Sequence, residues 1–398
     1  MFTNTCLVVA DRIPISPEVL AWARQTAGFK LDELAATKQF GKIGRWESGE
    51  ESPTYSQLEK LAEKFHRPIA VFFFPKPPLE ETVEKALRSV SDASIENLNP
   101  AIHFLFRKAK AFQLGLAALF EGQEDLQQKR VSWMSQADSN INLSSAERIR
   151  SLLDVSIEVQ QAWPNPDEAF KEWRRRLATR GIFVFKDAFK NIDISGFCVY
   201  DDIFPIIFIN NSLSKNRQIF TLFHELAHLI LKQSFLDVET EDTWLVDQAN
   251  IGNEEALCNK LAAEILVPTS HMLAQIGDKL VNQNLIRELS DYYHVSKEVI
   301  ARKLLDQNLI SQGFYHAAIR EWYAPRENYD RSEAKGGGDY YNSKAAYLGD
   351  AYISIVLKSY YRGTIDLIQA SDYLDIKPKS FQALEERFLQ KEKVDVYI

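Results

Sequence analysis

The feature that most constrains this chain is a pair of histidines spaced one helical turn apart inside an apolar segment. His224, Glu225 and His228 belong to the pentapeptide His-Glu-Leu-Ala-His. Residues four apart project from the same face of a helix, so both imidazoles can reach one metal ion. The neighbouring residues are apolar and predict a buried helix: Phe223, Leu226, Leu229, Ile230 and Leu231. Buried histidines need polar partners, and a metal ion supplies them.

Glu225 lies between the two histidines, where its carboxylate can serve as a base. A metal lowers the pKa of a bound water toward 7, and the glutamate can take the proton that is released as hydroxide attacks a carbonyl. The alternative is a surface helix with two chance histidines. Only 7 histidines occur in 398 residues, and this pair lies in an apolar helix behind a predicted strand, so we favour the metal site.

A catalytic metal site needs a third protein ligand. The next predicted helix, over residues 253–266, has an apolar face, and a carboxylate on that face would be anomalous without a cation. Glu255 is the first choice for the ligand and Glu254 is the second. Zinc is the expected ion, and manganese or iron would suit the same ligands.

Other polar residues compete for roles at this site. His271 and His294 are rival metal ligands, and we interpret Glu264 as a solvated surface residue. An oxyanion stabiliser should also exist. The sequence does not choose among the candidate donors, which are Tyr292, Tyr293, His294 and Tyr315.

Charge and cysteine content exclude several other classes of protein. The chain has 47 Lys and Arg against 55 Asp and Glu, a net charge of −8, which disfavours a general electrostatic grip on nucleic acid or an anionic membrane. Cys6, Cys198 and Cys258 form no Cys-x-x-Cys pair, which excludes a cysteine zinc site and fits a reducing compartment. We find no targeting segment and no apolar run of about 18 residues, so we expect a soluble cytoplasmic protein without a membrane partner.

Hydrophobic periodicity predicts an α+β, predominantly helical protein of two or three domains. Three apolar, β-rich segments are expected to form a small antiparallel sheet: residues 182–185, 196–200 and 205–210. Helical segments are expected within residues 17–75, 79–180, 215–232, 253–266, 283–310 and 343–395. A linker is expected at residues 326–343, which include three consecutive glycines.

Three motifs in matching order and spacing resemble the ImmA/IrrE family of metallopeptidases. They are the segment that begins with residues 205–210, the His-Glu-Leu-Ala-His pentapeptide, and the stretch Glu255-x-x-Cys258-Asn259 that leads to Pro268. The resemblance covers about residues 160–310. It implies a zincin-like, gluzincin-type peptidase domain in which a glutamate on the second helix completes a His-His-Glu zinc site. Glu255 matches that glutamate.

The resemblance also implies an activity and a partner. Family members are bacterial or phage-borne endopeptidases that cleave helix-turn-helix repressors, so a repressor of that kind is the expected protein substrate. The resemblance further implies a strand beside the cleft, formed by Ile206, Ile207, Phe208 and Ile209. An edge of that strand could bind substrate by strand addition, with backbone hydrogen bonds for affinity and side-chain pockets for specificity.

Residues 23–74 resemble the Cro/repressor-type, XRE-like helix-turn-helix domain, through Leu34-Ala35, Trp46-Glu47-Ser48-Gly49, Pro53 and a Leu-x-x-Leu-Ala helix. The resemblance implies a DNA-reading face, whose candidate residues are Lys38, Gln39, Lys42 and Arg45. Two departures weigh against DNA binding. The segment that should start the recognition helix is about two residues short, and Gly41 and Gly44 each cost about 1 kcal/mol of helix propensity. The alternative is a module that docks a repressor protein.

We therefore expect a helix-turn-helix domain over residues 1–78, a helical connector over 79–180, a peptidase domain over 181–320, and a linker with a helical C-terminal region over 321–398. The leading function is a zinc-dependent endopeptidase. The alternative is a DNA-binding regulator or antitoxin-like binding protein with a structural or silent metal site. A hydrolase of small molecules is disfavoured because no cofactor or phosphate loop is found.

The helix-turn-helix-like segment at 283–305 is interpreted as a solvated helix face.

Overall fold

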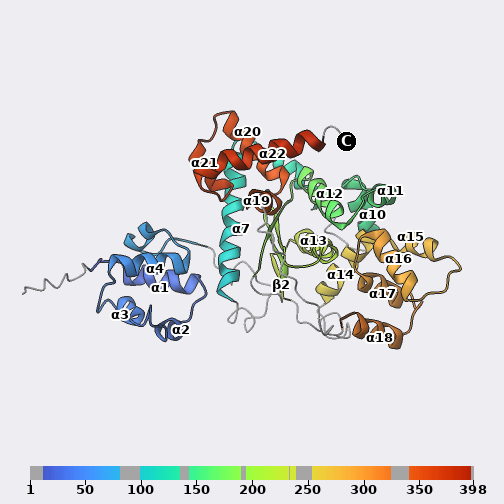
Figure 1. The fold of residues 1–398 in the computed structure, drawn as a ribbon, viewed down its shortest axis with the longest axis horizontal. Helices are drawn as coiled ribbons and strands as arrows, with labels where there is room; N and C mark the ends of the chain where they lie inside the picture. Colours follow the sequence, from blue (N-terminus) through green and yellow to red (C-terminus); the bar gives the residue numbers. More distant parts are fainter. Residues whose placement is uncertain are drawn as a thin grey trace, which may run out of the picture. The chain divides into compact units, whose positions relative to one another are not determined.

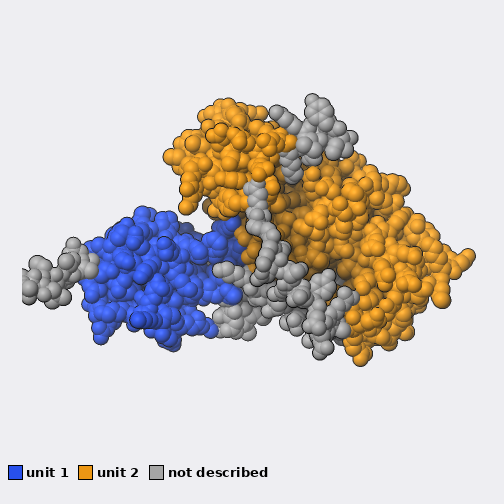
Figure 2. Space-filling model, viewed as in Figure 1, with its two compact units in different colours: residues 1–108 blue, residues 109–398 orange. Residues whose placement is uncertain are grey.

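The computed structural model describes residues 12–80, 99–134, 143–189, 194–232, 234–238, 253–323 and 340–395. The chain divides into two compact units, residues 1–108 and 109–398, which are coloured separately in Figure 2. The division falls inside α7 (Pro100–Leu119). The domain limits expected at residues 78, 180 and 320 stay predictions.

Unit 1 begins with a small helical bundle. Its elements are α1 (Pro17–Thr26), α2 (Leu31–Ala35), α3 (Ile43–Glu47), α4 (Tyr55–Phe65) and the 3-10 helix η1 (Ile69–Phe73). Ser16 caps α1 and Thr54 opens α4 with a capping box, so local hydrogen bonds define where these helices start. The guanidinium of Arg24 donates two hydrogen bonds to the Glu47 carboxylate and so ties α1 to α3. Trp46 is buried in the apolar core between these helices.

Unit 2 contains a mixed sheet. Its strands are β1 (Phe183–Asp187), β2 (Ile194–Val199), β3 (Ile206–Asn210) and β4 (Phe235–Val238), in the order β1-β3-β2-β4. β3 pairs antiparallel with β2 and parallel with β1, while β4 pairs antiparallel with β2. The expectation of a wholly antiparallel sheet is therefore wrong. β1 and β2 run in opposite directions with β3 between them, so β3 must be parallel to one of its two neighbours.

The position of β3 also corrects the expected substrate strand. Ile206, Ile207, Phe208 and Ile209 do form a strand, but β3 is paired on both sides, with Phe208 opposite Phe185 of β1 and Phe197 of β2. Its backbone hydrogen bonds are used within the sheet, so this strand has no edge to which a substrate strand could be added.

Both faces of the sheet are covered by helices, which explains why its strands are apolar without alternation. One face, which carries Val184, Ile207 and Ile209, packs against α13 (Lys215–Ile230) over β2 and β3 and against α12 (Pro166–Thr179) over β1. The other face carries an aromatic cluster, in which Phe185 stacks on Phe112 of α7 with ring centroids 4.5 Å apart and meets Tyr352 of α20 edge-on. Figure 1 shows α7 and α13 on opposite sides of the strands.

The remaining helices of unit 2 surround this centre. Before the sheet come α8 (Glu124–Val131), α10 (Leu143–Leu152), α11 (Ile157–Gln161) and α12 (Pro166–Thr179). After α13 come α14 (Asn253–Leu266), α15 (Thr269–Ile276), α16 (Gln283–Tyr293), α17 (Lys297–Asp306) and α18 (Gln312–Tyr323). The C-terminal helices, red in Figure 1, are α19 (Tyr340–Leu348), α20 (Asp350–Tyr361), α21 (Leu367–Tyr373), η3 (Pro378–Ser380) and α22 (Phe381–Asp395).

The predicted fold class is confirmed, because helices dominate both units and the sheet is small. Across the described ranges, none of the helices combines the length and apolar character that a membrane span requires.

Candidate metal centre

The centre is built on α13, which the local sequence specifies well. Ser214 caps the helix by accepting a hydrogen bond from the Arg217 amide, and every residue from 218 to 230 is buried. The helix carries His224, Glu225 and His228, which are 4%, 0% and 0% exposed. Three polar side chains are thus held in a helix that is packed against the sheet on one side and α14 on another.

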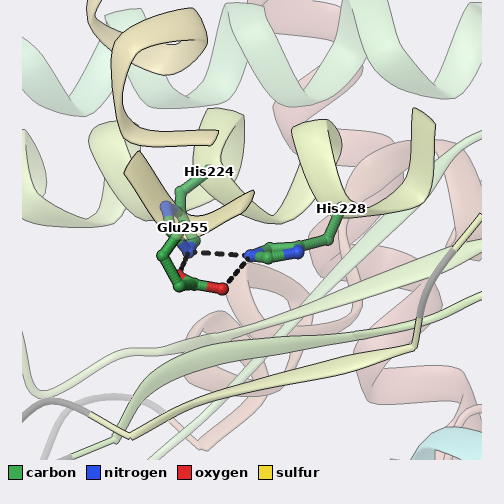
Figure 3. A group of neighbouring side chains, drawn as sticks. All are labelled: His224, His228 and Glu255. Atoms are coloured by element: carbon green, nitrogen blue, oxygen red, sulfur yellow. Dashed lines mark hydrogen bonds and ion pairs between the residues drawn. The ribbon is translucent and has the colours of Figure 1, made fainter. Parts of the chain in front are cut away.

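Glu255 of α14 meets the two histidines, as Figure 3 shows. Its carboxylate oxygens lie 3.4 Å from Nε2 of His224 and 3.3 Å from Nε2 of His228, while the two Nε2 atoms are 3.1 Å apart. The structure therefore brings together the three side chains proposed as ligands. One ligand atom from each lies within 4.8 Å of the others.

Neighbouring side chains of α14 orient both imidazoles. Nδ1 of His224 lies 2.9 Å from Oδ1 of Asn259, and Nδ1 of His228 lies 3.7 Å from Sγ of Cys258. An amide oxygen only accepts hydrogen bonds, so Nδ1 of His224 donates, and in the neutral imidazole Nε2 keeps a lone pair toward the cluster. The same tautomer in His228 would leave both Nε2 atoms available to a cation.

The electrostatics of the cluster favour an ionised carboxylate. Burial by itself would raise the pKa of Glu255, but when the imidazoles of His224 and His228 are protonated, their hydrogen bonds and charge outweigh burial and lower that pKa to about 2. Cys258 behaves oppositely, because burial and the nearby carboxylates raise the pKa of its thiol. The thiol therefore stays protonated beside His228 and does not compete as an anionic ligand.

The donor set fits a divalent transition metal. Two imidazole nitrogens and one carboxylate are ligands that zinc accepts in catalytic sites, and this set would leave an ion free to bind water or substrate. The Glu255 side chain is 29% exposed, so the cluster is reachable from solvent on its carboxylate side. Glu225 is fully buried and follows His224 directly on α13.

The rival ligands fall outside this cluster. Glu254 is exposed, Nδ1 of His271 is 2.7 Å from the Tyr293 hydroxyl, and Nε2 of His294 is 2.9 Å from the Trp163 carbonyl. Within the described ranges, the one group of potential ligands found is His224, His228 and Glu255.

The interpretation of Glu264 as a surface residue is wrong. Its carboxylate is buried and accepts hydrogen bonds from the Thr269 amide, the Thr269 hydroxyl and the Lys303 ammonium. Lys303 lies on α17, far along the chain, so no local pattern could have predicted the pair. Glu264 therefore links α14 to α15 and α17 and has no part in the metal cluster.

The proposed oxyanion donors have partners elsewhere. Tyr292 and Tyr293 bond to Gln161 and His271, and Tyr315 is buried in the core of unit 2. These contacts give no support to an oxyanion role.

The four proposed DNA-reading residues of unit 1 are exposed, and two of them form ion pairs with a glutamate. Lys42 and Arg45 both bind the Glu51 carboxylate, at 2.9 and 2.7 Å, and these contacts lower the pKa of Glu51. Lys38 and Gln39 lie in the turn between α2 and α3, and α3 is only five residues long. The structure thus offers a short helix whose two cations share one carboxylate.

A buried His-Glu-x-x-His helix beside a small sheet, with a carboxylate from a second helix, defines the class of HExxH metallopeptidase-like sites. Residues 178–305 match the peptidase family model Peptidase_M78, described as the IrrE N-terminal-like domain. The match includes the sheet, α13, α14 and most of α17, and it stops short of unit 1 and the C-terminal helices. Among curated proteins, no match to the chain was found.

Sequence reasoning missed the orienting roles of Asn259 and Cys258. A signal was present, because Asn259 lies four residues after Glu255 and therefore on the same face of α14. Cys258 lies three residues after Glu255 on that face.

Proposed function

We propose that this protein is a zinc-dependent endopeptidase that cleaves a helix-turn-helix repressor in a bacterial, phage or mobile-element regulatory circuit. The observation that carries the proposal is the convergence of His224, His228 and Glu255 from two packed helices, α13 and α14. The family match over residues 178–305 supports a peptidase of the IrrE type. Cytoplasmic localisation belongs to the same proposal, since repressors act there.

In the proposed reaction, His224, His228 and Glu255 hold the ion, with manganese or iron as alternatives to zinc. A bound ion would supply Lewis acidity at the scissile carbonyl and lower the pKa of a water molecule. Glu225 accepts a proton from the attacking water at its carboxylate and then passes that proton to the leaving amine nitrogen. Glu225 is completely buried on the same helix as the two histidines, which holds its side chain in place beside them.

The first prediction tests both the base and the ligand. Glu225→Gln should retain bound zinc but lose about 10²–10⁴-fold in cleavage rate, because the amide cannot accept the proton. Glu255→Ala should lose the zinc itself. The measurements are metal content by mass spectrometry and cleavage of the repressor encoded beside the gene.

The matched control is Glu288→Gln, an exposed glutamate of α16 that should leave metal content and cleavage unchanged. The proposal fails if the zinc-loaded wild type leaves the repressor intact and Glu225→Gln behaves in the same way. It also fails if the wild type takes up no metal after zinc is added back.

The rival function is a DNA-binding regulator or antitoxin-like protein whose metal site is structural or silent. The short α3 and the sharing of Glu51 by Lys42 and Arg45 weigh against a DNA-reading face and favour a docking role for unit 1. A gel-shift assay on the DNA upstream of the gene separates these roles. A specific shift that Lys38→Ala weakens would favour the regulator, and no shift would favour docking.

A further inference from the structure

A cavity lies in unit 2 and is lined by α12, β1, the start of α13 and the C-terminal helices α19 and α20. Its volume is about 290 Å³, which is large enough for a small organic molecule. Part of its wall is apolar and includes Phe170, Leu348 and Tyr352. Its ionisable lining is unbalanced toward positive charge, with five cationic and three acidic residues.

The key residue of this cavity is Lys186 of β1. Its side chain shares a sheet face with Val184, two residues earlier, and is only 6% exposed. The ammonium lies 5.1 Å from the ring centre of Phe170. Over the ranges that the structure describes, none of the ion pairs includes Lys186.

The charges around Lys186 add to the imbalance. Lys215 of α13 and Arg174 of α12 both act on it as like charges, and Asp167 is the opposing acid. Asp167 is itself exposed and pairs with Lys215 at 3.4 Å. Burial, followed by the charges of Lys215 and Arg174, lowers the pKa of Lys186 to about 7. A buried lysine that takes part in no ion pair of the described residues is costly, and a bound anion would offset that cost.

Arg174 plays a structural part in the same cavity. Its guanidinium donates hydrogen bonds to the carbonyls of Val184, Ala346 and Tyr347, at 2.6, 2.7 and 2.7 Å. The backbone of Gly349 passes so close that a Cβ atom there would lie 2.5 Å from Cζ of Arg174. These contacts fix the end of α19 against β1 and α12, so the cavity has a defined wall.

We propose that this cavity is a binding site for a small organic anion, with its acidic group against Lys186 and Lys215 and its apolar part against Phe170, Leu348 and Tyr352. A carboxylate and a phosphate share the required chemistry. Because Lys215 is the first residue of α13, the ligand would contact the helix that carries His224 and His228. The proposal concerns binding alone and does not depend on peptidase activity.

The test is isothermal titration of the full-length chain at slightly acidic pH with three anions: benzoate, phenyl phosphate and inorganic phosphate. Benzyl alcohol serves as the neutral analogue. At least one of the three anions should bind the wild type. Its affinity for Lys186→Met should be lower by about tenfold or more. Benzyl alcohol should bind the wild type more weakly than that anion does. Lys129→Met, which alters an exposed lysine of α8 outside the cavity, should bind like the wild type. Tighter binding of the aromatic anions than of inorganic phosphate would support the apolar contacts.

A second readout keeps the test independent of how the variant folds. Acetic anhydride should modify Lys186 in the wild type, and the bound anion should protect Lys186 but not Lys129, as read by peptide mass spectrometry. The proposal is overturned if none of the three anions binds at millimolar concentration, or if binding neither depends on Lys186 nor protects it.

Discussion

At the scale of single residues, the proposed metal site depends on side chains that orient its ligands and are not ligands themselves. Asn259 fixes the ring of His224 by accepting from Nδ1, and this leaves Nε2 facing Glu255. Such outer partners set both the tautomer and the orientation of a metal-binding histidine. We therefore treat Asn259 as a positioning residue of the proposed metal site.

Asn259→Ala should lower zinc affinity by about 10–100-fold while the fold is kept, because the imidazole of His224 loses its orienting acceptor. Competition with a chelating dye measures the affinity. Lys260→Ala, which changes the exposed neighbour on α14, is the control. Equal zinc affinity in the two variants would contradict the positioning role.

Lys186 predicts a specific dependence of stability on pH. Its folded pKa of about 7 lies below the 10.5 expected of an unfolded lysine. Between those values the unfolded chain binds the extra proton, so stability rises with pH and the cost of the buried charge is greatest below pH 7. Lys186→Met should therefore stabilise the protein by up to about 5 kcal/mol below pH 7, with the gain shrinking as pH rises toward 10.

Denaturant melts of wild type and Lys186→Met across this pH range measure the difference in their free energies of unfolding. The other titrating groups are the same in both proteins, so their contributions cancel in this difference. A gain that does not change with pH would mean that Lys186 is not held below its usual pKa. Excess benzoate should reduce the gain, since the anion stabilises the charged lysine only in the wild type.

At the scale of elements, the contact between the sheet and α13 positions the histidines. Gly196 of β2 permits this contact, because a Cβ atom there would lie 2.7 Å from Cγ2 of Thr221 and 2.8 Å from the Phe208 carbonyl oxygen. Thr221 lies one turn before His224 on α13. The closeness of strand and helix thus depends on the absence of a side chain at one position.

Gly196→Ala should lower the free energy of unfolding by about 1–3 kcal/mol, because the added methyl group overpacks a tight interface. Zinc affinity should fall with it as α13 shifts. Gly313→Ala in α18, where the new methyl meets nothing closer than 3.8 Å, is the matched control. Urea melts and zinc titrations measure both effects, and a stable Gly196→Ala variant would show that the interface can relax.

At the scale of the whole molecule, two compact units share one chain, and the proposed metal site belongs entirely to unit 2. A ligand that binds only the folded state stabilises the unit that holds it. The C-terminal helices are part of the same unit, since Arg174 joins them to α12 and β1.

Removal of metal should therefore act on one unit. Chelation should lower the melting temperature of the transition assigned to unit 2 by several degrees, while the transition of unit 1 stays in place. Scanning calorimetry of the zinc-loaded and chelated protein measures this, and Glu255→Ala with added zinc should resemble the chelated wild type. Equal shifts of both transitions would show that the units unfold together.

Much of the fold and the centre of the site could be predicted from local pattern. The helices α13 and α14 follow from apolar periodicity, and α14 begins and ends at the predicted residues, Asn253 and Leu266. The predictions that were wrong concern contacts between residues far apart in the chain. The antiparallel sheet, the free edge of β3 and the solvated Glu264 were each wrong, because strand order and buried ion pairs join segments far apart in the chain.

The sequence by itself determined that His224 and His228 share a helix face, because the spacing of a helix fixes this within five residues. It also placed Glu255 on the next core helix. Only the tertiary structure decided that Asn259 orients His224, that β3 is an inner strand, and that Lys186 and Lys215 line one cavity. The physical reason is that periodicity encodes which side of an element is buried, whereas the partner on that side is chosen by packing of the whole chain.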